Sequence, residues 1–551
     1  MRIAFRNLSK IAVVAVFLVA ASAIAAENDV QPGGVLTLAN RGDPPAGFDT
    51  MRTSSIALHH VAGAIFGPGN LVMRCRENMY FTCPYLASSW VSNQSLTEWI
   101  FTIREGVYWH DGEPFTAEDV AFWFELVFFG ARSGGKVRAP AYFANELGNA
   151  ERVDILSFNR VRVVFRERNP HFLEILANPR FKIAHPRHLM GPEIARGNVS
   201  VTPLDVDLIG LGPFKLSRYR PGTLVRLKQF DRYWELDSLG NQLPHLEGID
   251  FVVMRDPYAM DIAFRTGRLD GTARGQGHYL SADRIVAYER ELGEESQFIR
   301  MEGGNFRLAF NVLREGAWQD SRVRRAIALW IDKSAAIPLA LGGFGWTSPD
   351  LGPPDIPIPR HFVNWPKFDI SPVEERRIEA RRLLAEAGYV DGFAMGHLTR
   401  GIYTAPAEYL KSQLAEIGID LNLQIVDEGE WNRARVSLDY DSQQGRLSPS
   451  PIPEGTESVY GRFSSNPDAY AKHEDPAVDS LYYRLRQATS LPQRVAIWRE
   501  IERYLFVEQT YIVPIAESIN VVAYRNYVRG IVVPTEDAHT HTDFATVWID
   551  E

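Results

Sequence analysis

The chain has 551 residues, of which 45% are hydrophobic, 11% aromatic and 23% charged. This length exceeds one ordinary hydrophobic core, so we expect two or three packed lobes, and the composition excludes a disordered chain. The formal net charge of −9 argues against nucleic acid as a partner, because its phosphates would be repelled.

An export signal is predicted at the N-terminus. Basic residues in the first ten positions precede an apolar run at 11–26. At about 16 residues this run is shorter than the roughly 20 that span a bilayer. Ala23 and Ala25 place small side chains where a signal peptidase needs them. We therefore expect residues 1–25 to be a cleaved signal peptide, whose removal takes the formal charge to about −12.

The two cysteines of the chain, Cys75 and Cys83, are separated by seven intervening residues. In an exported chain such a gap can close a loop, which favours a disulfide. Two free buried thiols are the alternative. A metal site built on the pair is disfavoured, because no histidine lies between or close beside them.

Residues 104–125, REGVYWHDGEPFTAEDVAFWFE, place five ionisable side chains within ten positions: His110, Asp111, Glu113, Glu118 and Asp119. Thr116 and Asp119 have the spacing of a capping box, and the preceding His-Asp-Gly is typical of a tight turn. Side chains on a turn and a first helical turn point in different directions. We therefore interpret the segment as a strand, turn and helix start, and not as a catalytic or metal cluster.

Two other kinds of sequence pattern could indicate a binding site for phosphate or metal. Residues 130–137 fit G-x-x-x-x-G-K, but Val137 stands where a phosphate loop needs a hydroxyl and a helix precedes them. Pairs of histidines are weak metal signals, and we expect no metal or cofactor. These pairs are His59 with His60, His185 with His188, and His539 with His541.

Helical and strand patterns alternate along the rest of the chain, which predicts an α/β fold. Apolar and polar residues alternate at 155–168 like one half-buried strand. Helices are predicted at 320–333, 374–388 and 407–418, and two more near the C-terminus, after Asp475 and from Pro492. A strand is predicted at 419–426, and residues 511–525 read as two strands. Proline-rich loops occupy 349–366 and 448–455.

Motifs in order along most of the chain carry a family resemblance. They are PYLASSW (84–90), the signature-like stretch 104–124, IGLGPFKLSRYRPG (209–222), FDRYWE (230–235), FRTGRLDG (264–271), FNVLREGAWQDSRVRRAIALWIDK (310–333) and LLAEAGYVDGF (383–393). Together they resemble the extracellular solute-binding proteins, family 5, of ABC transporters, which include oligopeptide, dipeptide and nickel binding proteins.

The resemblance implies a bilobal periplasmic-binding-protein fold of type II, with three subdomains and a hinge between the lobes. It places lobe I at 27–78, 206–305 and 515–551, an inserted subdomain at 79–205 and lobe II at 306–514. It also implies a monomer in the periplasm of a Gram-negative cell, which closes on a small peptide or other solute and delivers it to permease subunits.

The resemblance also assigns a ligand site. Trp431 matches a helix tryptophan of the peptide-binding members, and Gly445 matches a later glycine. Arg446 stands at the family's next tryptophan and Pro449 at the aspartate that takes a peptide's amino group. Arg446 could instead hold a carboxylate or phosphate, or be a solvated loop arginine.

Further residues complete the expected ligand set. Asp439 or Asp441 could replace the missing acid. The other ligand residues implied by the resemblance are Phe66, Asn311, Trp346, Tyr460 and Arg462, although packing is an equal alternative for Trp346.

We therefore expect a transport receptor without catalysis, binding oligopeptide-like ligands. Pro449 keeps an opine, an oligosaccharide or another solute as the alternative, and nickel or haem stays open because family members carry such ligands with few side-chain contacts. A secreted hydrolase using Asp439 and Asp441 is disfavoured, because i,i+2 spacing in a loop gives no acid and base geometry.

Overall fold

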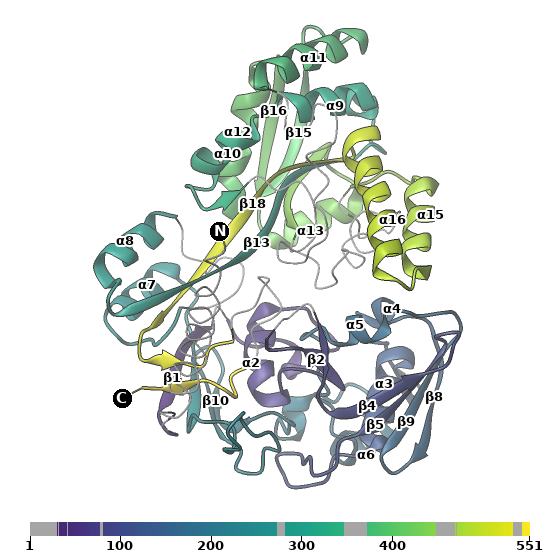
Figure 1. Cartoon of the computed structure of the whole chain (residues 1–551), viewed down its shortest axis with the longest axis vertical. Helices are drawn as coiled ribbons and strands as arrows, with labels where there is room; N and C mark the ends of the chain where they lie inside the picture. Colours follow the sequence, from purple (N-terminus) through teal and green to yellow (C-terminus); the bar gives the residue numbers. More distant parts are fainter. Residues whose placement is uncertain are drawn as a thin grey trace, which may run out of the picture.

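The computed structural model describes residues 30, 32–40, 42–77, 81–272, 282–346, 372–447, 465, 469, 471–532 and 543–550. They form two bodies, one above the other, which are joined by the long strands β13 (Ser296–Phe310) and β18 (Ile512–Arg525) (Figure 1). The predicted signal peptide lies outside these residues. No helix within the described ranges is long and apolar enough to cross a membrane.

Lobe I is built on a four-stranded sheet in the order β1, β12, β11, β10. The strands are β1 (Val35–Asn40), β10 (Phe214–Arg220), β11 (Leu224–Gln229) and β12 (Gly248–Val253). β1 runs parallel to β12, and the other neighbours are antiparallel. Helix α2 (Ile56–Phe66) is mostly apolar, and it is buried along all but its first residue in the core of this lobe.

Shorter elements complete lobe I near the hinge. Helices α7 (Pro257–Arg265) and α8 (Ala282–Leu292) contribute Phe264 and Tyr288 to an apolar cluster with Val521 of β18. The chain returns here after β18. The remaining elements are β19 (Val528–Arg529), β20 (Trp548–Ile549), η1 (Ala46–Phe48) and η2 (Pro203–Val206).

The inserted subdomain has an antiparallel sheet in the order β4, β5, β9, β8 and a core rich in aromatic side chains. Trp123 and Phe124 of α3 (Ala117–Phe129) lie in this core, which couples the helix to the sheet. Its other elements are β3 (Thr82–Pro84), β4 (Ala87–Ser92), β5 (Glu98–Ile103), β6 (Ala131–Ser133), β7 (Lys136–Arg138), α4 (Ala144–Leu147), β8 (Ala150–Ser157), β9 (Arg160–Phe165), α5 (Phe172–Leu176) and α6 (Arg187–Ala195). Strand β2 (Val72–Arg74), which precedes the expected boundary at 78/79, pairs with β3.

Two sequence patterns in the inserted subdomain fold as hairpins. The single strand predicted at 155–168 is wrong, because the chain turns at Phe158 and Asn159 between β8 and β9. Residues 130–137 do not form a phosphate loop. They cap α3 and form the β6–β7 hairpin, with Gly134 and Gly135 at positive φ in its two-residue turn.

Lobe II is built on a six-stranded sheet in the order β14, β18, β13, β17, β15, β16. Its own strands are β14 (Gly345–Trp346), β15 (Phe393–Arg400), β16 (Ile419–Val426) and β17 (Ser442–Leu447). One core with this sheet includes residues of the helices α9 (Ser321–Trp330), α10 (Lys333–Ala340), α11 (Val373–Glu386) and α12 (Thr404–Ala415). Helices α15 (Pro476–Gln487) and α16 (Leu491–Arg503) form a separate antiparallel pair (Figure 1).

The helices predicted at 320–333, 374–388, 407–418, after Asp475 and from Pro492 are present as α9, α11, α12, α15 and α16. Lobe II also contains α13 (Glu428–Ser437) and the short turns η3 (Ala317–Gln319), η5 (Gly401–Tyr403) and η6 (Tyr504–Glu508). Asp475 caps α15 by accepting a hydrogen bond from Ala477 N at 2.9 Å, as its sequence position suggests.

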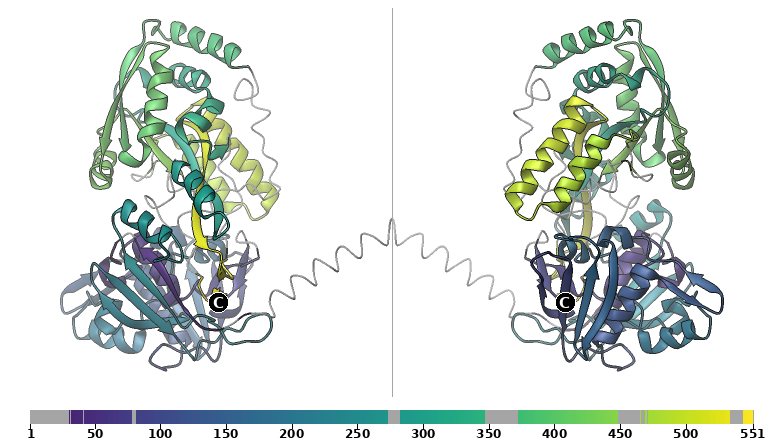
Figure 2. Two further views of the ribbon diagram at one scale, coloured as in Figure 1. Left: turned by 90° about the vertical axis from the view of Figure 1, so that its left-hand side faces the viewer. Right: turned by 90° about the vertical axis from the view of Figure 1, so that its right-hand side faces the viewer.

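Strands β13 and β18 pair with each other antiparallel along nearly their whole length. The prediction of two strands at 511–525 is wrong, because β18 is one strand of 14 residues, with the register shifting beside Pro514. At about 3.3 Å per residue such a strand extends roughly 46 Å. It therefore reaches from one body to the other, as Figure 2 shows from both sides.

The expected lobe boundaries at 305/306 and 514/515 fall inside these two crossing strands. The division of the chain into lobes by residue number stays a prediction.

Candidate functional site

The ionisable side chains of residues 104–125 do not converge on one point. His110 accepts a hydrogen bond from Gly210 N at Nδ1 (3.1 Å), and its Nε2 contacts the carbonyl oxygen of Gly212 (3.0 Å). Burial lowers the pKa of His110 to about 4. Asp119 accepts a hydrogen bond from Thr116 N (3.0 Å) as part of a capping box. The interpretation of this segment as a helix start is therefore confirmed.

The cysteine pair braces the start of the inserted subdomain. Cys75 and Cys83 form a disulfide across the β2–β3 hairpin, with their Cα atoms 5.2 Å apart. Beside it, Arg74 Nη2 donates a hydrogen bond to the carbonyl oxygen of Glu174 on α5 (2.7 Å). The disulfide therefore lies next to the hydrogen bond between Arg74 and α5.

Glu174 also reaches across to lobe II. Its Oε1 atom lies 3.5 Å from Nη2 of Arg494 on α16, although the two residues are 320 positions apart. His171 Nδ1 contacts the other carboxylate oxygen at 3.0 Å. Because Glu174 and Arg494 belong to different bodies, the separation of the bodies would break this ion pair.

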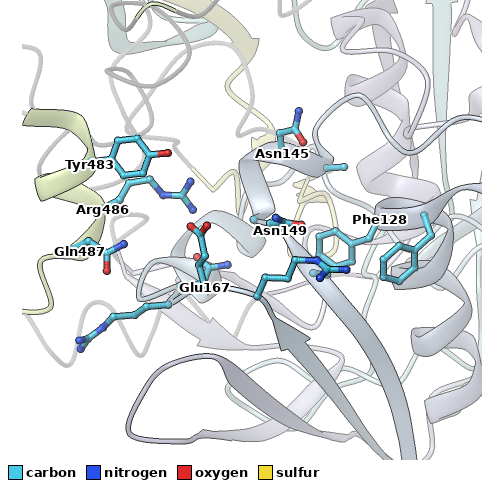
Figure 3. Close-up of a pocket in the computed structure, with 14 residues that line it drawn as sticks. Phe128, Asn145, Asn149, Glu167, Tyr483, Arg486 and Gln487 are labelled. Atoms are coloured by element: carbon cyan, nitrogen blue, oxygen red, sulfur yellow. The ribbon is translucent and has the colours of Figure 1, made fainter. Parts of the chain in front are cut away.

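A cavity of about 520 Å³ opens between the inserted subdomain and α15 (Figure 3). One wall comes from residues 128–129, 144–145, 148–150 and 166–169, and the other from Tyr483, Arg486 and Gln487. None of the residues predicted to bind ligand lines it.

Asn311 lies where the chain leaves β13 for lobe II, and it is fully buried. Its Nδ2 donates to the carbonyl oxygens of Leu438 (3.2 Å) and Tyr440 (3.0 Å), and its carbonyl accepts from Trp318 Nε1 (2.9 Å). These hydrogen bonds connect the loop before β17 to the segment that directly follows β13.

The two acids that could replace the missing aspartate are already held by one arginine. Arg314 Nη1 lies 2.8 Å from Asp439 Oδ1, and its Nε lies 3.0 Å from Asp441 Oδ1. Asp441 also accepts from Gly396 N at 2.7 Å. In this arrangement both carboxylates have a cationic partner within the protein.

Trp431 forms a small buried cluster with Leu398 and Tyr440 and is 4% exposed. The guanidinium of Arg400 lies 4.5 Å from its ring centre, and that of Arg435 lies 5.4 Å away. An arginine near the indole is favourable electrostatically. The tryptophan therefore packs between α13 and β15.

The other predicted ligand residues are spread over the chain. Phe66 is fully buried at the end of α2 in the core of lobe I. Trp346 pairs with Glu517 in the sheet, and Arg446 pairs with Phe306. Tyr460, Arg462 and the Pro449 position lie outside the described residues.

A buried polar group on β15 and β17 was missed by sequence reasoning. His397 Nδ1 lies 2.9 Å from Ser442 Oγ, and its Nε2 lies 3.4 Å from Gln444 Oε1. Burial lowers the pKa of His397 to about 4, so the ring is neutral at pH 7. The signal was present in the polar residues of GHLTR (396–400) and SQQGR (442–446), which lie inside a sheet.

The histidines of these pairs that the structure describes have structural roles. His59 and His60 are buried on α2, and burial lowers the pKa of His59 to about 3. His185 is buried against Asp49 at 2.9 Å. Within the described ranges, no three His, Cys, Asp or Glu side chains are grouped to hold a metal ion. His539 and His541 lie outside those ranges.

Comparison with known proteins gives a family match across most of the chain. The family model of the bacterial extracellular solute-binding proteins, family 5, matches residues 83–470. A di/tripeptide-binding protein from Pseudomonas aeruginosa (strain UCBPP-PA14) is 25% identical over 536 residues, which cover 92% of this chain and 93% of that protein.

Solved structures share the fold. The periplasmic binding protein DppA from Helicobacter pylori, in complex with the peptide STSA, has a TM-score of 0.75 at 20% identity and covers 96% of this chain and 100% of that one. The binding protein AgaA from A. tumefaciens R10, in complex with agropinic acid, has a TM-score of 0.73 at 23% identity, with coverage of 94% and 99%. The predicted α/β periplasmic-binding-protein fold is confirmed.

Proposed function

Because the chain belongs to the bacterial extracellular solute-binding proteins of family 5, we propose that it captures a small solute between its lobes in the periplasm and delivers it to the permease of an ABC importer. The protein is exported with a cleaved signal peptide and works as a monomer. It carries out no catalysis on its cargo.

The observation that carries this proposal is the two-strand connection between the bodies. β13 and β18 cross from one to the other side by side (Figure 1). A connection of two strands supports bending, because few backbone positions have to change for one body to rotate against the other. The Arg494–Glu174 contact supports a form in which the bodies are close.

The ligand that this proposal favours is oligopeptide-like. One curated relative is a di/tripeptide-binding protein, and DppA was solved with a peptide.

A specific observation keeps an opine-like, carboxylate-bearing ligand as the second candidate. Asp439 and Asp441 are both bound to Arg314, so neither offers a free charge to a peptide's amino group. A buried ammonium without a carboxylate partner is costly. AgaA, of similar fold, was solved with agropinic acid.

The hydrolase alternative receives no support from the same residues. An acid and base pair needs two carboxylates facing one bond, with different proton affinities. Asp439 and Asp441 instead face one guanidinium.

Native mass spectrometry of protein purified from its own periplasm, without denaturation, tests the proposal. We expect a retained small molecule, and its mass distinguishes a peptide from an opine. Protein stripped of this cargo should melt at a higher temperature when the cargo is returned, since a ligand at 100 times its Kd stabilises the folded form by about 2.7 kcal/mol. Release of a chemically altered cargo would refute the receptor role.

A further inference from the structure

The cavity between the inserted subdomain and α15 carries the opposite charge to the chain as a whole. Its lining includes three guanidinium groups, from Arg166, Arg168 and Arg486, and one carboxylate, from Glu167. These groups leave a formal charge of +2 on a cavity of a chain whose formal charge is −9. A positive concavity concentrates anions near it.

No ion pair within the described part of the chain neutralises these charges. The side chains of Arg166, Arg168 and Arg486 form no ion pair with another residue that the structure describes, and neither does Glu167. Figure 3 shows Arg486 reaching from α15 into the space in front of Glu167 and Asn149 on the opposite wall. By contrast, Arg484, on the same helix, is paired with Glu500 at 2.7 Å.

Neutral polar groups surround the arginines. Asn145, Asn149 and Gln487 line the cavity with side-chain amides. Asn169 is 2% exposed, and its Nδ2 donates to the carbonyl oxygen of Leu147 (2.7 Å). Its Oδ1 is buried and receives no hydrogen bond from the described part of the chain. A buried acceptor without a donor is costly, so a ligand or water donor there would be favourable.

From this geometry we infer that the cavity is an accessory site for a small multivalent oxyanion, a carboxylate or a phosphate, separate from the site of the transported solute. A guanidinium forks onto either group through two parallel N–H donors. A volume of about 520 Å³ is within the range of small-molecule sites.

The lining of this cavity comes from both bodies of the protein. Arg166 and Arg168 belong to the inserted subdomain, and Arg486 belongs to α15. An anion that contacts both walls binds best when the two bodies are close. By linkage, it then strengthens the binding of any cargo that also requires the closed form.

Isothermal titration with citrate, inorganic phosphate and acetate at low salt tests the inference on the full mature protein. We expect citrate or phosphate to bind, and acetate to bind far more weakly because it carries one charge. Arg486→Gln should weaken the binding about tenfold or more, since it removes one charge-assisted contact. Arg484→Gln is the matched control, because it makes the same charge change on the same helix outside the cavity.

The titrations with citrate and with phosphate also distinguish the chemical class of the oxyanion. Binding of citrate alone assigns a carboxylate ligand, and binding of phosphate alone assigns a phosphate ligand. Arg166→Gln with Arg168→Gln should abolish either signal while the circular dichroism spectrum stays unchanged. Absence of binding by all three anions at millimolar concentration, or equal weakening by Arg486→Gln and Arg484→Gln, overturns the inference.

Discussion

Replacing Arg494 with glutamine removes the ion pair that joins α16 to Glu174 of the inserted subdomain. The two charged atoms lie 3.5 Å apart, and the side chains are 11% and 28% exposed. At an effective dielectric constant of about 20, such a pair attracts by roughly 5 kcal/mol before desolvation. Lost hydration offsets most of this attraction, so we expect the pair to stabilise the closed form by about 1 kcal/mol.

A loss of this size should appear in cargo affinity. When a ligand binds the closed form, weakening that form by about 1 kcal/mol raises the apparent Kd about fivefold. Arg494→Gln should therefore weaken cargo binding fivefold, although Arg494 is not among the residues expected to touch ligand. The dissociation rate should account for most of the change.

The assay is isothermal titration with the retained cargo, on wild type and on two variants. Arg503→Gln is the control, because Arg503 lies on the same helix and pairs with Glu508 within lobe II. Its affinity should equal that of wild type. If Arg494→Gln and Arg503→Gln bind equally well, the ion pair does not hold the bodies together.

The same pair predicts a dependence on pH. Burial raises the pKa of Glu174, but the hydrogen bond from His171 and the charge of Arg494 outweigh it, so the pKa lies below its ordinary value. A carboxyl group with a lowered pKa stabilises the folded arrangement above its ordinary pKa of about 4.3, and this contribution is lost as the pH falls through the lowered value. Wild-type affinity should therefore fall more steeply below pH 4 than that of Arg494→Gln.

Two further predictions concern stability. Replacing Cys75 and Cys83 with serine opens the loop that the disulfide closes across a separation of eight residues. Loop entropy predicts that the free energy of unfolding falls by about 2 to 3 kcal/mol. Urea denaturation measures this change, and an unchanged midpoint would exclude a constraining bond. Asp49→Asn leaves Arg138, whose side chain is 3% exposed, without its carboxylate at 2.5 Å, which should cost about 3 to 5 kcal/mol. Burial raises the pKa of Asp49, but His185 and Arg138 hold it below its ordinary value, so wild type should lose this stabilisation in acid while the variant does not; equal acid sensitivity of both proteins would refute this.

Local features were predictable because their causes are local. The capping box of Thr116 and Asp119 depends on residues three positions apart, and the structure contains it. Asp320 caps α9 through another local contact, by accepting a hydrogen bond from Arg322 N. Apolar spacing then identified most helices of lobe II.

The errors arose where distant contacts decide the outcome. Periodicity continued unbroken through Phe158 and Asn159, although the chain turns there. Two strands were expected at 511–525, yet Glu517 and Ser518 in the middle of this segment both pair with β13 in one strand that crosses between the bodies. No pattern within β18 itself reveals a partner more than 200 positions earlier.

The candidate site was less predictable than the fold for the same reason. Family motifs located Asn311 and Trp431, but their contacts with Tyr440 come from tertiary structure. The Arg494–Glu174 pair and the cationic cavity join segments about 320 positions apart. Spacing in the sequence cannot show that such side chains meet.

Small-angle X-ray scattering of the cargo-free protein during titration with its retained cargo tests the central proposal most directly. Hinge closure about β13 and β18 predicts a radius of gyration that decreases in proportion to bound cargo and returns when the cargo is removed. Stoichiometric binding of the cargo with an unchanged radius of gyration would contradict capture by closure.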